Sequence, residues 1–185
     1  AVMSRNPYSF RTHDQLPVEN VSYYDALEFI DRLNQLTESN YRLPSEAEWE
    51  FAARERGDIL RFGNGKNIAE PTEINFNADI SFKRSYSASG RFLKQTSPIG
   101  SYPPNALGLF DMSGNLFEWT SDFYHENGYQ MHGILDPVVN NNSSFVVARG
   151  GSWNNHASRL RCTCRSYFQP AVRNPLVGFR LARSA

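Results

Sequence analysis

The side chains best suited to redox or metal chemistry are two cysteines and four histidines. Because a single residue separates Cys162 from Cys164, a disulfide between them would be strained, and no third cysteine is present to pair with either. We therefore expect two free thiols. A Cys-x-Cys pair can also begin a metal site, but its other ligands would come from scattered histidines: His13, His125, His132 and His156. We favour the simpler interpretation, in which two small side chains lie on a strand or loop.

The last quarter of the chain carries side chains that are suited to binding. Two glycine-containing motifs, Arg149-Gly-Gly-Ser-Trp153 and Gly178-Phe-Arg-Leu181, enclose an interval that has no sustained period of 2 or 3.6 and no acidic residue. Within this interval apolar anchors occur beside directional hydrogen-bond donors, which is a mixture found in binding surfaces. The anchors are Tyr167, Phe168 and Leu176, and the donors are His156 and Arg159.

The same side chains have alternative interpretations. Aromatic residues usually fill a core, so Tyr167, Phe168 and Val172 can also be packing residues. If they face a ligand instead, replacing Tyr167 and Phe168 with alanine should leave the stability of the fold nearly unchanged. A catalytic role for His156 or Cys164 is disfavoured, because no neighbouring base or nucleophile is spaced to activate either side chain.

Length and composition indicate one domain over residues 1–185, with a core of its own. Basic and acidic residues balance at 19 each, so the chain as a whole has no charge imbalance that favours nucleic acid or an anionic membrane. No apolar run approaches the ~20 residues that cross a bilayer, and the N-terminus lacks the apolar region of a signal peptide. We therefore expect a partner that is recognised locally, with no nucleic acid and no membrane span.

Two helices are predicted in the first third of the chain. Ser22, followed by Asp25 and by apolar residues at helical spacing, indicates an amphipathic helix over about 23–36. Ser45-Glu-Ala-Glu48 has the form of a capping box and opens a second helix, which Gly57 is expected to end.

The remainder of the chain loses this periodicity and is rich in Gly, Asn, Pro and Ser. Short apolar segments at 145–148 and 178–182 are predicted to be strands. Two helices followed by a loop-rich remainder with few strands predict an α+β fold.

A series of motifs runs along almost the whole chain: Asn6-Pro-Tyr-Ser-Phe10, Leu16-Pro-Val-Glu-Asn-Val-Ser22, Tyr41-Arg-Leu-Pro-Ser-Glu-Ala-Glu-Trp-Glu-Phe-Ala-Ala-Arg54, Asn105-Ala-Leu-Gly-Leu-Phe-Asp-Met-Ser-Gly-Asn-Leu-Phe-Glu-Trp-Thr120, Arg149-Gly-Gly-Ser-Trp153 and Gly178-Phe-Arg180. Together and in this order they resemble the formylglycine-generating-enzyme (sulfatase-modifying factor) family. The resemblance implies a C-type-lectin-like fold, with two helices packed on a small antiparallel sheet and long irregular loops. Family members usually begin with a further strand-rich segment, so we expect this sequence to be trimmed at its N-terminus.

The resemblance implies a structural calcium ion, bound by the residues that match Asp111, Gly114, Leu116 and Glu118. Two carboxylates and two backbone carbonyls within one short loop are hard oxygen ligands of the kind that calcium prefers. In the alternative interpretation, Asp111 caps a turn and Glu118 forms an ordinary ion pair.

The resemblance also bears on catalysis. Enzymes of the family oxidise thiols at a copper site, through a cysteine pair that follows the Gly-Gly-Ser-aromatic motif. The matching interval here, residues 154–160, contains no cysteine, and Cys162 matches a position that the enzymes use for a non-catalytic residue, while Cys164 has no counterpart. Because a soft thiolate pair is what binds Cu(I), we predict that this chain binds no copper and is not an enzyme.

Segment 149–181 resembles one subset of the family, the variable proteins of diversity-generating retroelements, in which reverse transcription mutates template adenines. Randomising the first two bases of an AAC codon never yields Lys, Glu, Gln, Met or Trp, and between the two bounding motifs only Gln169 departs from this rule. The resemblance implies that the variable, ligand-binding positions are His156, Ser158, Arg159, Cys164, Ser166, Tyr167, Phe168, Val172, Pro175 and Leu176.

These features predict a non-catalytic, receptor- or adhesin-like protein that binds a protein or glycan on another cell's surface through segment 149–181. The resemblance to spirochaete-type variable lipoproteins implies display at the cell surface, by a lipid signal that is not in this sequence. Two alternatives stay open. One is a formylglycine-generating or related metal-dependent oxygenase with a displaced metal site, and the other is an invariant structural or regulatory module of the same fold.

Overall fold

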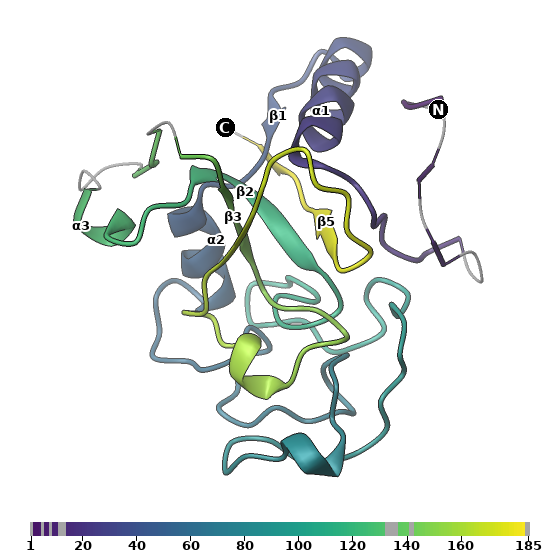
Figure 1. The fold of residues 1–185 in the computed structure, drawn as a ribbon, viewed down its shortest axis with the longest axis vertical. Coiled ribbons are helices and arrows are strands. Elements are labelled where there is room, and N and C mark those ends of the chain that lie inside the picture. The colour runs from purple at the N-terminus through teal and green to yellow at the C-terminus, as the bar shows by residue number, and fades with distance from the viewer. Residues whose placement is uncertain are drawn as a thin grey trace.

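The structure is a computed structural model that describes residues 2–4, 6–7, 9–10, 14–131, 137–140 and 143–183. It is an α+β fold, as predicted, in which helices and a small sheet occupy one half and long loops the other (Figure 1). The elements are α1 (Tyr23–Thr37), β1 (Tyr41–Arg42), α2 (Glu46–Ala53), η1 (Ile80–Phe82), β2 (Phe117–Phe123), α3 (Gly128–Met131), β3 (Val146–Arg149), η2 (Ala157–Arg159), β4 (Ser166–Phe168), β5 (Val177–Phe179) and β6 (Ala182–Arg183). Within the described residues, no helix has both the length and the apolar character needed to span a bilayer.

Both predicted helices are confirmed, and each begins with a capping box. At α1 the Ser22 hydroxyl accepts from the Asp25 amide (3.1 Å), and the Asp25 carboxylate accepts from the Ser22 amide (2.8 Å). Ser45 and Glu48 exchange the same two hydrogen bonds at α2, also at 3.1 and 2.8 Å. These bonds satisfy backbone donors that have no partner within the helix, so the local sequence is sufficient to start each helix.

The end of α2 differs from the prediction. The helix ends at Ala53 rather than at Gly57, because Glu55 and Arg56 adopt left-handed backbone conformations with φ of 49° and 76°. Residues of that type rarely adopt such a conformation, and the sequence gives no local signal for it.

The main sheet has the strand order β4-β3-β2-β5. The β4–β3 and β3–β2 pairs are antiparallel, whereas β2 and β5 are parallel, so the sheet is mixed rather than wholly antiparallel. The strand predicted at 145–148 is β3, and the one predicted at 178–182 divides into β5 and β6, of which β6 pairs with β1. The central strand β2 was missing from the predicted strands, because its side chains are buried on both faces and the alternation typical of a strand is lost.

The main core lies between α1 and the sheet, around Trp119 of β2. This side chain is fully buried, and its indole N–H donates to the carbonyl of Val21 (3.1 Å). The Phe168 ring packs edge-on against Phe117 and Trp119, with centroids 5.6 and 5.8 Å apart. Phe168 therefore belongs to the core, with the geometry that aromatic pairs prefer.

The loop-rich half is held by two smaller apolar clusters. One gathers Phe62, Ile74 and Phe76 with Ala157 and Leu160, so that η2 packs directly against the loops. The other gathers Trp49, Met112 and Cys162 beneath α2. Both clusters include residues of segment 149–181, and the sequence-distant loops therefore position this segment.

Alanine substitutions in β4 test this arrangement. We expect Phe168→Ala to lower the free energy of unfolding by about 3 kcal/mol, because it removes a ring from the core. Tyr167, 46% exposed, should lose less than about 1 kcal/mol on the same change. Urea denaturation of both variants measures the difference. The expectation that both substitutions leave stability unchanged is not retained for Phe168, because its ring packs against the core. Equal losses in the two variants would contradict the placement of the two rings.

Candidate functional site

Segment 149–181 is anchored by a buried arginine at its start. The side chain of Arg149 in β3 is fully buried, and its guanidinium donates to the main-chain carbonyls of Cys164 (2.5 Å) and Cys162 (2.8 Å). It also forms an ion pair with Glu50 and lies over the Trp49 ring, 5.3 Å from the centroid. The guanidinium contacts the segment through main-chain atoms, so these contacts do not depend on which side chains the segment carries.

A second arginine fastens the segment to the N-terminus of α2. The Arg165 guanidinium makes a two-pronged pair with Glu46, with both distances 2.7 Å, and donates to the carbonyl of His125 (2.8 Å). It lies 4.9 Å from the centroids of both Tyr124 and Tyr129. Glu46 is fully buried, and its charge is compensated by this arginine together with Arg149, whose Nε lies 3.5 Å from Glu46 Oε1.

Two glycines of the bounding motifs sit where a side chain would not fit. A Cβ on Gly151, whose φ is 74°, would lie 2.9 Å from the carbonyl oxygen of Arg159. A Cβ on Gly178 would lie 2.5 Å from the carbonyl oxygen of Val18. The motifs therefore require glycine because of close backbone approach, and both ends of the segment are fixed.

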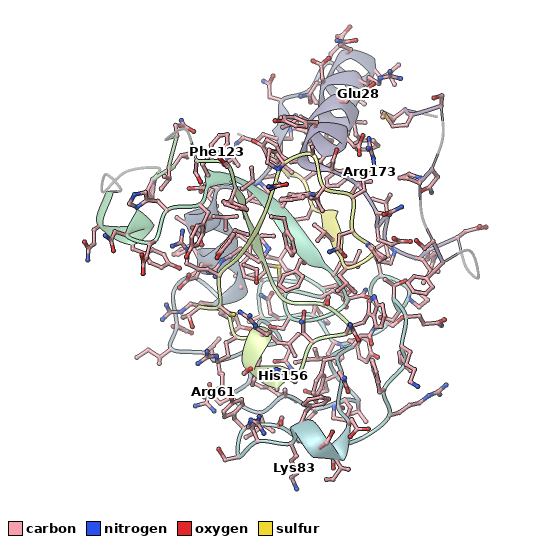
Figure 2. All side chains as sticks on the ribbon, viewed as in Figure 1. Glu28, Arg61, Lys83, Phe123, His156 and Arg173 are labelled. Carbon is pink, nitrogen blue, oxygen red and sulfur yellow. The ribbon has the colours of Figure 1, made fainter. Side chains whose placement is uncertain are left out.

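The predicted ligand-binding residues fall into three groups along the segment. His156, Ser158 and Arg159 lie at η2, where the Ser158 hydroxyl is 2.7 Å from His156 Nδ1. Arg159 is exposed, and the His156 ring stacks on Phe82 of η1 (centroids 5.5 Å apart). This group therefore borders the loop-rich half, as the positions of His156 and Lys83 in Figure 2 illustrate.

The second group lies on and before β4. Tyr167 faces solvent, Cys164 and Ser166 are half-buried, and Phe168 points into the core. The Tyr167 ring packs against Tyr124 (centroids 4.0 Å apart) and Phe145 (5.2 Å). These two partners were missed because they come from distant segments and carry no local signal.

The third group lies in the loop before β5. Pro175 is exposed and Val172 is half-buried, whereas Leu176 packs against the main core. Leu176 and Phe168 therefore have packing roles, and a ligand surface would be formed by the other eight positions. In Figure 1 the segment crosses in front of the sheet from η2 towards β5, so the three groups follow one path across the molecule.

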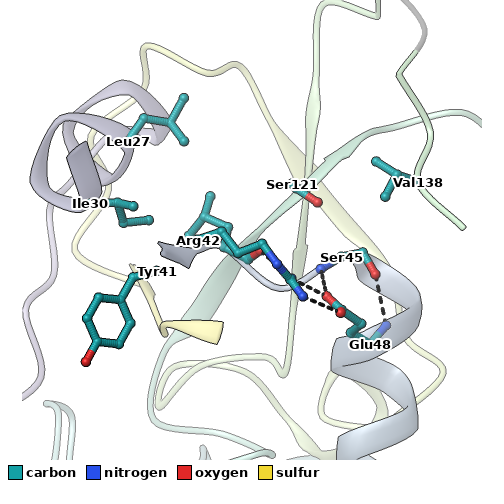
Figure 3. Close-up of a pocket in the computed structure, with 9 residues that line it drawn as sticks. Leu27, Ile30, Tyr41, Arg42, Ser45, Glu48, Ser121 and Val138 are labelled. Atoms are coloured by element: carbon teal, nitrogen blue, oxygen red, sulfur yellow. Dashed lines mark hydrogen bonds and ion pairs between the residues drawn. The ribbon is translucent and has the colours of Figure 1, made fainter. Parts of the chain in front are cut away.

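A separate cavity of about 480 Å³ lies between α1, β1 and the start of α2 (Figure 3). Apolar side chains, including Leu27, Ile30 and Val138, line part of its wall. Its charged residues bind each other, because Arg42 donates to both carboxylate oxygens of Glu48 at 2.6 and 2.7 Å. None of the predicted ligand-binding residues lines this cavity.

Asp111 and Glu118 line another cavity, of about 500 Å³, together with Leu116. Both Glu118 oxygens accept hydrogen bonds, from Trp49 (2.7 Å) and from two nitrogens of Arg180 (2.5 and 2.7 Å). Burial raises the pKa of Asp111, and the nearby Glu118 charge raises it further, although a hydrogen bond from the Gly100 amide and the Arg180 charge oppose this.

A family model described as "Sulfatase-modifying factor enzyme 1-like domain" matches residues 3–185. The chain belongs to this family. It is 33% identical to the serine/threonine-protein kinase Pkn1 of Chlamydia trachomatis. That match covers 90% of this chain and 24% of the kinase. It is also 32% identical, over 91% of its length, to the formylglycine-generating enzyme of Streptomyces coelicolor, of which the match covers 53%. The chain thus spans a quarter to about half of these relatives.

Solved structures share the fold. PvdO from Pseudomonas aeruginosa superposes with a TM-score of 0.77 at 29% identity, over 95% of this chain and 65% of that one. Treponema denticola variable protein 1 superposes with a TM-score of 0.72 at 22% identity, over 98% of this chain and 78% of that one. The predicted C-type-lectin-like fold of the formylglycine-generating type is confirmed.

The prediction that the chain is not an enzyme is wrong. Its identity of about 30% with several formylglycine-generating enzymes assigns it to an enzyme family, and the loss of two cysteines does not outweigh that relationship. The matched relatives also include a protein of Mus musculus that is named inactive C-alpha-formylglycine-generating enzyme 2. It is 33% identical to this chain, and the match covers 92% of this chain and 50% of that protein.

The two thiols do not fit the thiolate copper site that the family resemblance implies. Both are free, as expected. Cys162 is fully buried, its thiol lies 3.5 Å from the carbonyl oxygen of Ala53, and burial raises its pKa to about 12. Within the described residues, no three His, Cys, Asp or Glu side chains form a group that could hold a metal ion. We derive no reaction through copper, and the expected absence of copper stays a prediction.

The family's calcium loop fits its ion only in part. Asp111, Leu116 and Glu118 line one cavity, but Gly114 does not, and Arg180 already compensates the charge of Glu118. The ordinary ion pair considered as the alternative for Glu118 is therefore present. Asp111 is half-buried, and desolvation raises the pKa of its carboxylate, so a cation beside it would be stabilising; calcium binding is retained as a proposal on this ground.

Calcium binding is tested by thermal unfolding. We expect saturating calcium to raise the stability, by about 2.7 kcal/mol at a hundredfold excess over Kd, relative to the protein in chelator. Asp111→Asn should abolish the increase and alter the calcium-free stability little, because the pKa of Asp111 is raised and its charged form is already disfavoured. Asp58→Asn, at an exposed position, is the control. An equal calcium response in Asp111→Asn would contradict the proposed ligand.

Proposed function

We propose that this chain is a ligand-binding domain whose segment 149–181 presents the binding surface for a protein or glycan on another cell. The observation that carries the proposal is that the segment is held by its main chain. Arg149 binds the carbonyls of Cys162 and Cys164, and the carbonyls of Pro170 and Asn174 accept from amides next to α1, at 3.0 and 3.1 Å. Side chains can therefore change without loss of these contacts.

The burial pattern supports the same proposal. The side chains of Arg149, Leu160, Cys162 and Val177 are buried, whereas several positions between them are exposed, including Asn154, Thr163 and Gln169. Buried anchors thus alternate with outward positions that are free to contact a partner. The exposed positions among those predicted to vary are Arg159, Tyr167 and Pro175.

The shared fold adds support for a segment that tolerates diversification. Treponema denticola variable protein 1 carries the word variable in its name, and its fold matches this chain over nearly all of its length. We extend the proposal to diversification of segment 149–181 by a retroelement and to display at the cell surface. Phe168 and Leu176 are excluded from the variable set, because core packing restricts both positions to apolar side chains.

Binding is tested with a matched pair of triple variants. We expect wild-type protein to bind at least one target on an array of cell-surface proteins and glycans. Replacing Arg159, Tyr167 and Pro175 with alanine should weaken that binding by roughly 30-fold or more, because aromatic and arginine side chains dominate binding surfaces. The control replaces the same residue types outside the segment: Arg32, Tyr24 and Pro104. Wild-type affinity in the first variant would contradict the proposed surface.

The surrounding DNA tests diversification separately. We expect a near-identical repeat of the sequence that encodes segment 149–181, differing from it only at adenines, beside a gene for a reverse transcriptase. Sequencing the DNA around the gene shows whether this repeat and the reverse transcriptase gene are present. If no such repeat is present, diversification is refuted, while the binding experiment still stands on its own.

A second candidate function is the activity named in the relatives, the generation of formylglycine. Its support is the sequence identity of about 30% with formylglycine-generating enzymes from several organisms. Incubation with copper and a cysteine-containing sulfatase peptide, followed by oxygen measurement and mass spectrometry of the peptide, tests it. Conversion of the cysteine with oxygen uptake would support this function, and an unchanged peptide would oppose it.

A further inference from the structure

The basic side chains of this protein are distributed in two ways. In the half that contains α1, α2 and the sheet, most arginines are paired with carboxylates: Arg32, Arg42, Arg54, Arg149, Arg165, Arg173 and Arg180. In the loop-rich half, a set of exposed cations has no carboxylate partner within the described residues: Arg61, Lys83, Arg84, Arg159 and Arg161. We call this set, together with Ile80 and Phe82, the basic tip. A balanced net charge therefore conceals a local excess of positive charge.

A closed series of contacts brings these cations together. Phe82, which directly precedes Lys83 and Arg84, stacks on His156 beside η2. Arg161 donates to the carbonyl of Ser158 (3.0 Å) and lines a small cavity with Arg61, whose guanidinium lies 4.6 Å from the Tyr86 ring. Tyr86 lies two residues after Arg84 in the sequence, which completes the series. Figure 2 accordingly shows Arg61, Lys83 and His156 at the same end of the molecule.

Within the described residues, no carboxylate forms an ion pair with these five cations. The partners of the cations are carbonyls and a ring, since Arg84 donates to the Lys83 carbonyl (3.0 Å) and Arg61 lies over Tyr86. The acidic residues on adjacent elements are Asp58, Glu70, Glu73 and Asp79. Of these, Glu73 pairs with Lys66. Asp79 accepts hydrogen bonds from the Ser81 hydroxyl (2.7 Å) and amide (2.9 Å), which lower its pKa, so it remains a single negative charge at the start of η1 beside the five cations.

Two apolar side chains project from the same place. Ile80 is 68% exposed and Phe82 is 39% exposed, and both belong to η1. η1 lies at one end of the long axis of the molecule, among the loops that form that end (Figure 1). A convex apolar point surrounded by cations matches a planar anionic interface, because the apolar groups can enter the headgroup region while the cations remain at its surface.

We propose that the basic tip docks this protein peripherally on the anionic face of a lipid bilayer. The exposed Ile80 and Phe82 favour a bilayer over a single anionic chain such as a nucleic acid, which would engage the cations but would leave the apolar side chains in water. The tip shares Arg159 with the predicted variable positions, and Arg161 also lies in segment 149–181. Its other members lie outside the variable positions, so the proposal stands without diversification.

Vesicle sedimentation tests the docking. We expect the protein to sediment with vesicles of phosphatidylcholine mixed with phosphatidylserine, to remain in solution with phosphatidylcholine alone, and to dissociate as salt is raised. Lys83→Gln combined with Arg84→Gln should weaken binding to the mixed vesicles by roughly 30-fold. The charge-matched control, Arg32→Gln with Arg183→Gln, removes two cations near α1 and β6 and should bind as wild type does. Failure of wild type to bind, or equal losses in both variants, would overturn the proposal.

A third variant separates a bilayer from a polyanion. Because Ile80 is exposed, Ile80→Ser should leave the unfolding temperature unchanged, and we expect it to weaken vesicle binding several-fold while retention on immobilised heparin stays the same. Retention on heparin without vesicle binding in wild type would instead identify a polyanion-binding surface and refute lipid docking. Neither result depends on Tyr167 or Pro175, so the proposed ligand surface is tested independently.

Discussion

The fold depends on a buried arginine that joins three parts of the chain. The Arg149 guanidinium lies where β3 ends and forms an ion pair with Glu50 of α2. Because its side chain is fully buried, water does not solvate its positive charge. Two carbonyls of the following segment also accept from the guanidinium, and its Nε lies 3.5 Å from the Glu46 carboxylate. Removing one partner from such a group costs about 3–5 kcal/mol, because an uncompensated charge remains inside the protein. Arg149 therefore links α2, the end of β3 and the C-terminal segment.

Holding a segment by its carbonyls separates its path from its composition. Side-chain contacts would limit what each position could carry, whereas a main-chain carbonyl is present at every residue. Among the positions predicted to vary, Phe168 and Leu176 are exceptions, because both pack against the core. Cys162 is a further fixed position: its thiol is enclosed and its pKa is raised to about 12, so its environment suits packing rather than reactivity.

Local signals in the sequence predicted the elements that depend on neighbours in the chain. The pairs Ser22 with Asp25 and Ser45 with Glu48 start their helices through bonds that span three residues. Features that depend on distant partners could not be predicted in this way. Phe168 looked like a surface anchor because nothing near it in the sequence reveals the rings of β2, and β2 itself lacks the alternation of a half-exposed strand. The sequence could therefore indicate which segment to consider as a candidate surface, whereas the inward and outward positions of that segment required the fold.

Net charge illustrates the same limit. A sum of zero gives no information about where the charges lie, and here the arginines that pair with carboxylates are concentrated around the helices and the sheet, where burial makes an unpaired charge costly. In the loops an exposed cation is solvated and needs no partner, so Lys83 and Arg84 can remain unpaired without loss of stability. Exposed, uncompensated charge contributes little to folding, and its field extends about 10 Å into solvent at moderate salt. Ile80 projects from the same turn and contributes nothing to the core, so folding does not explain why an exposed apolar side chain lies beside unpaired cations. Attraction to an anionic surface would explain it.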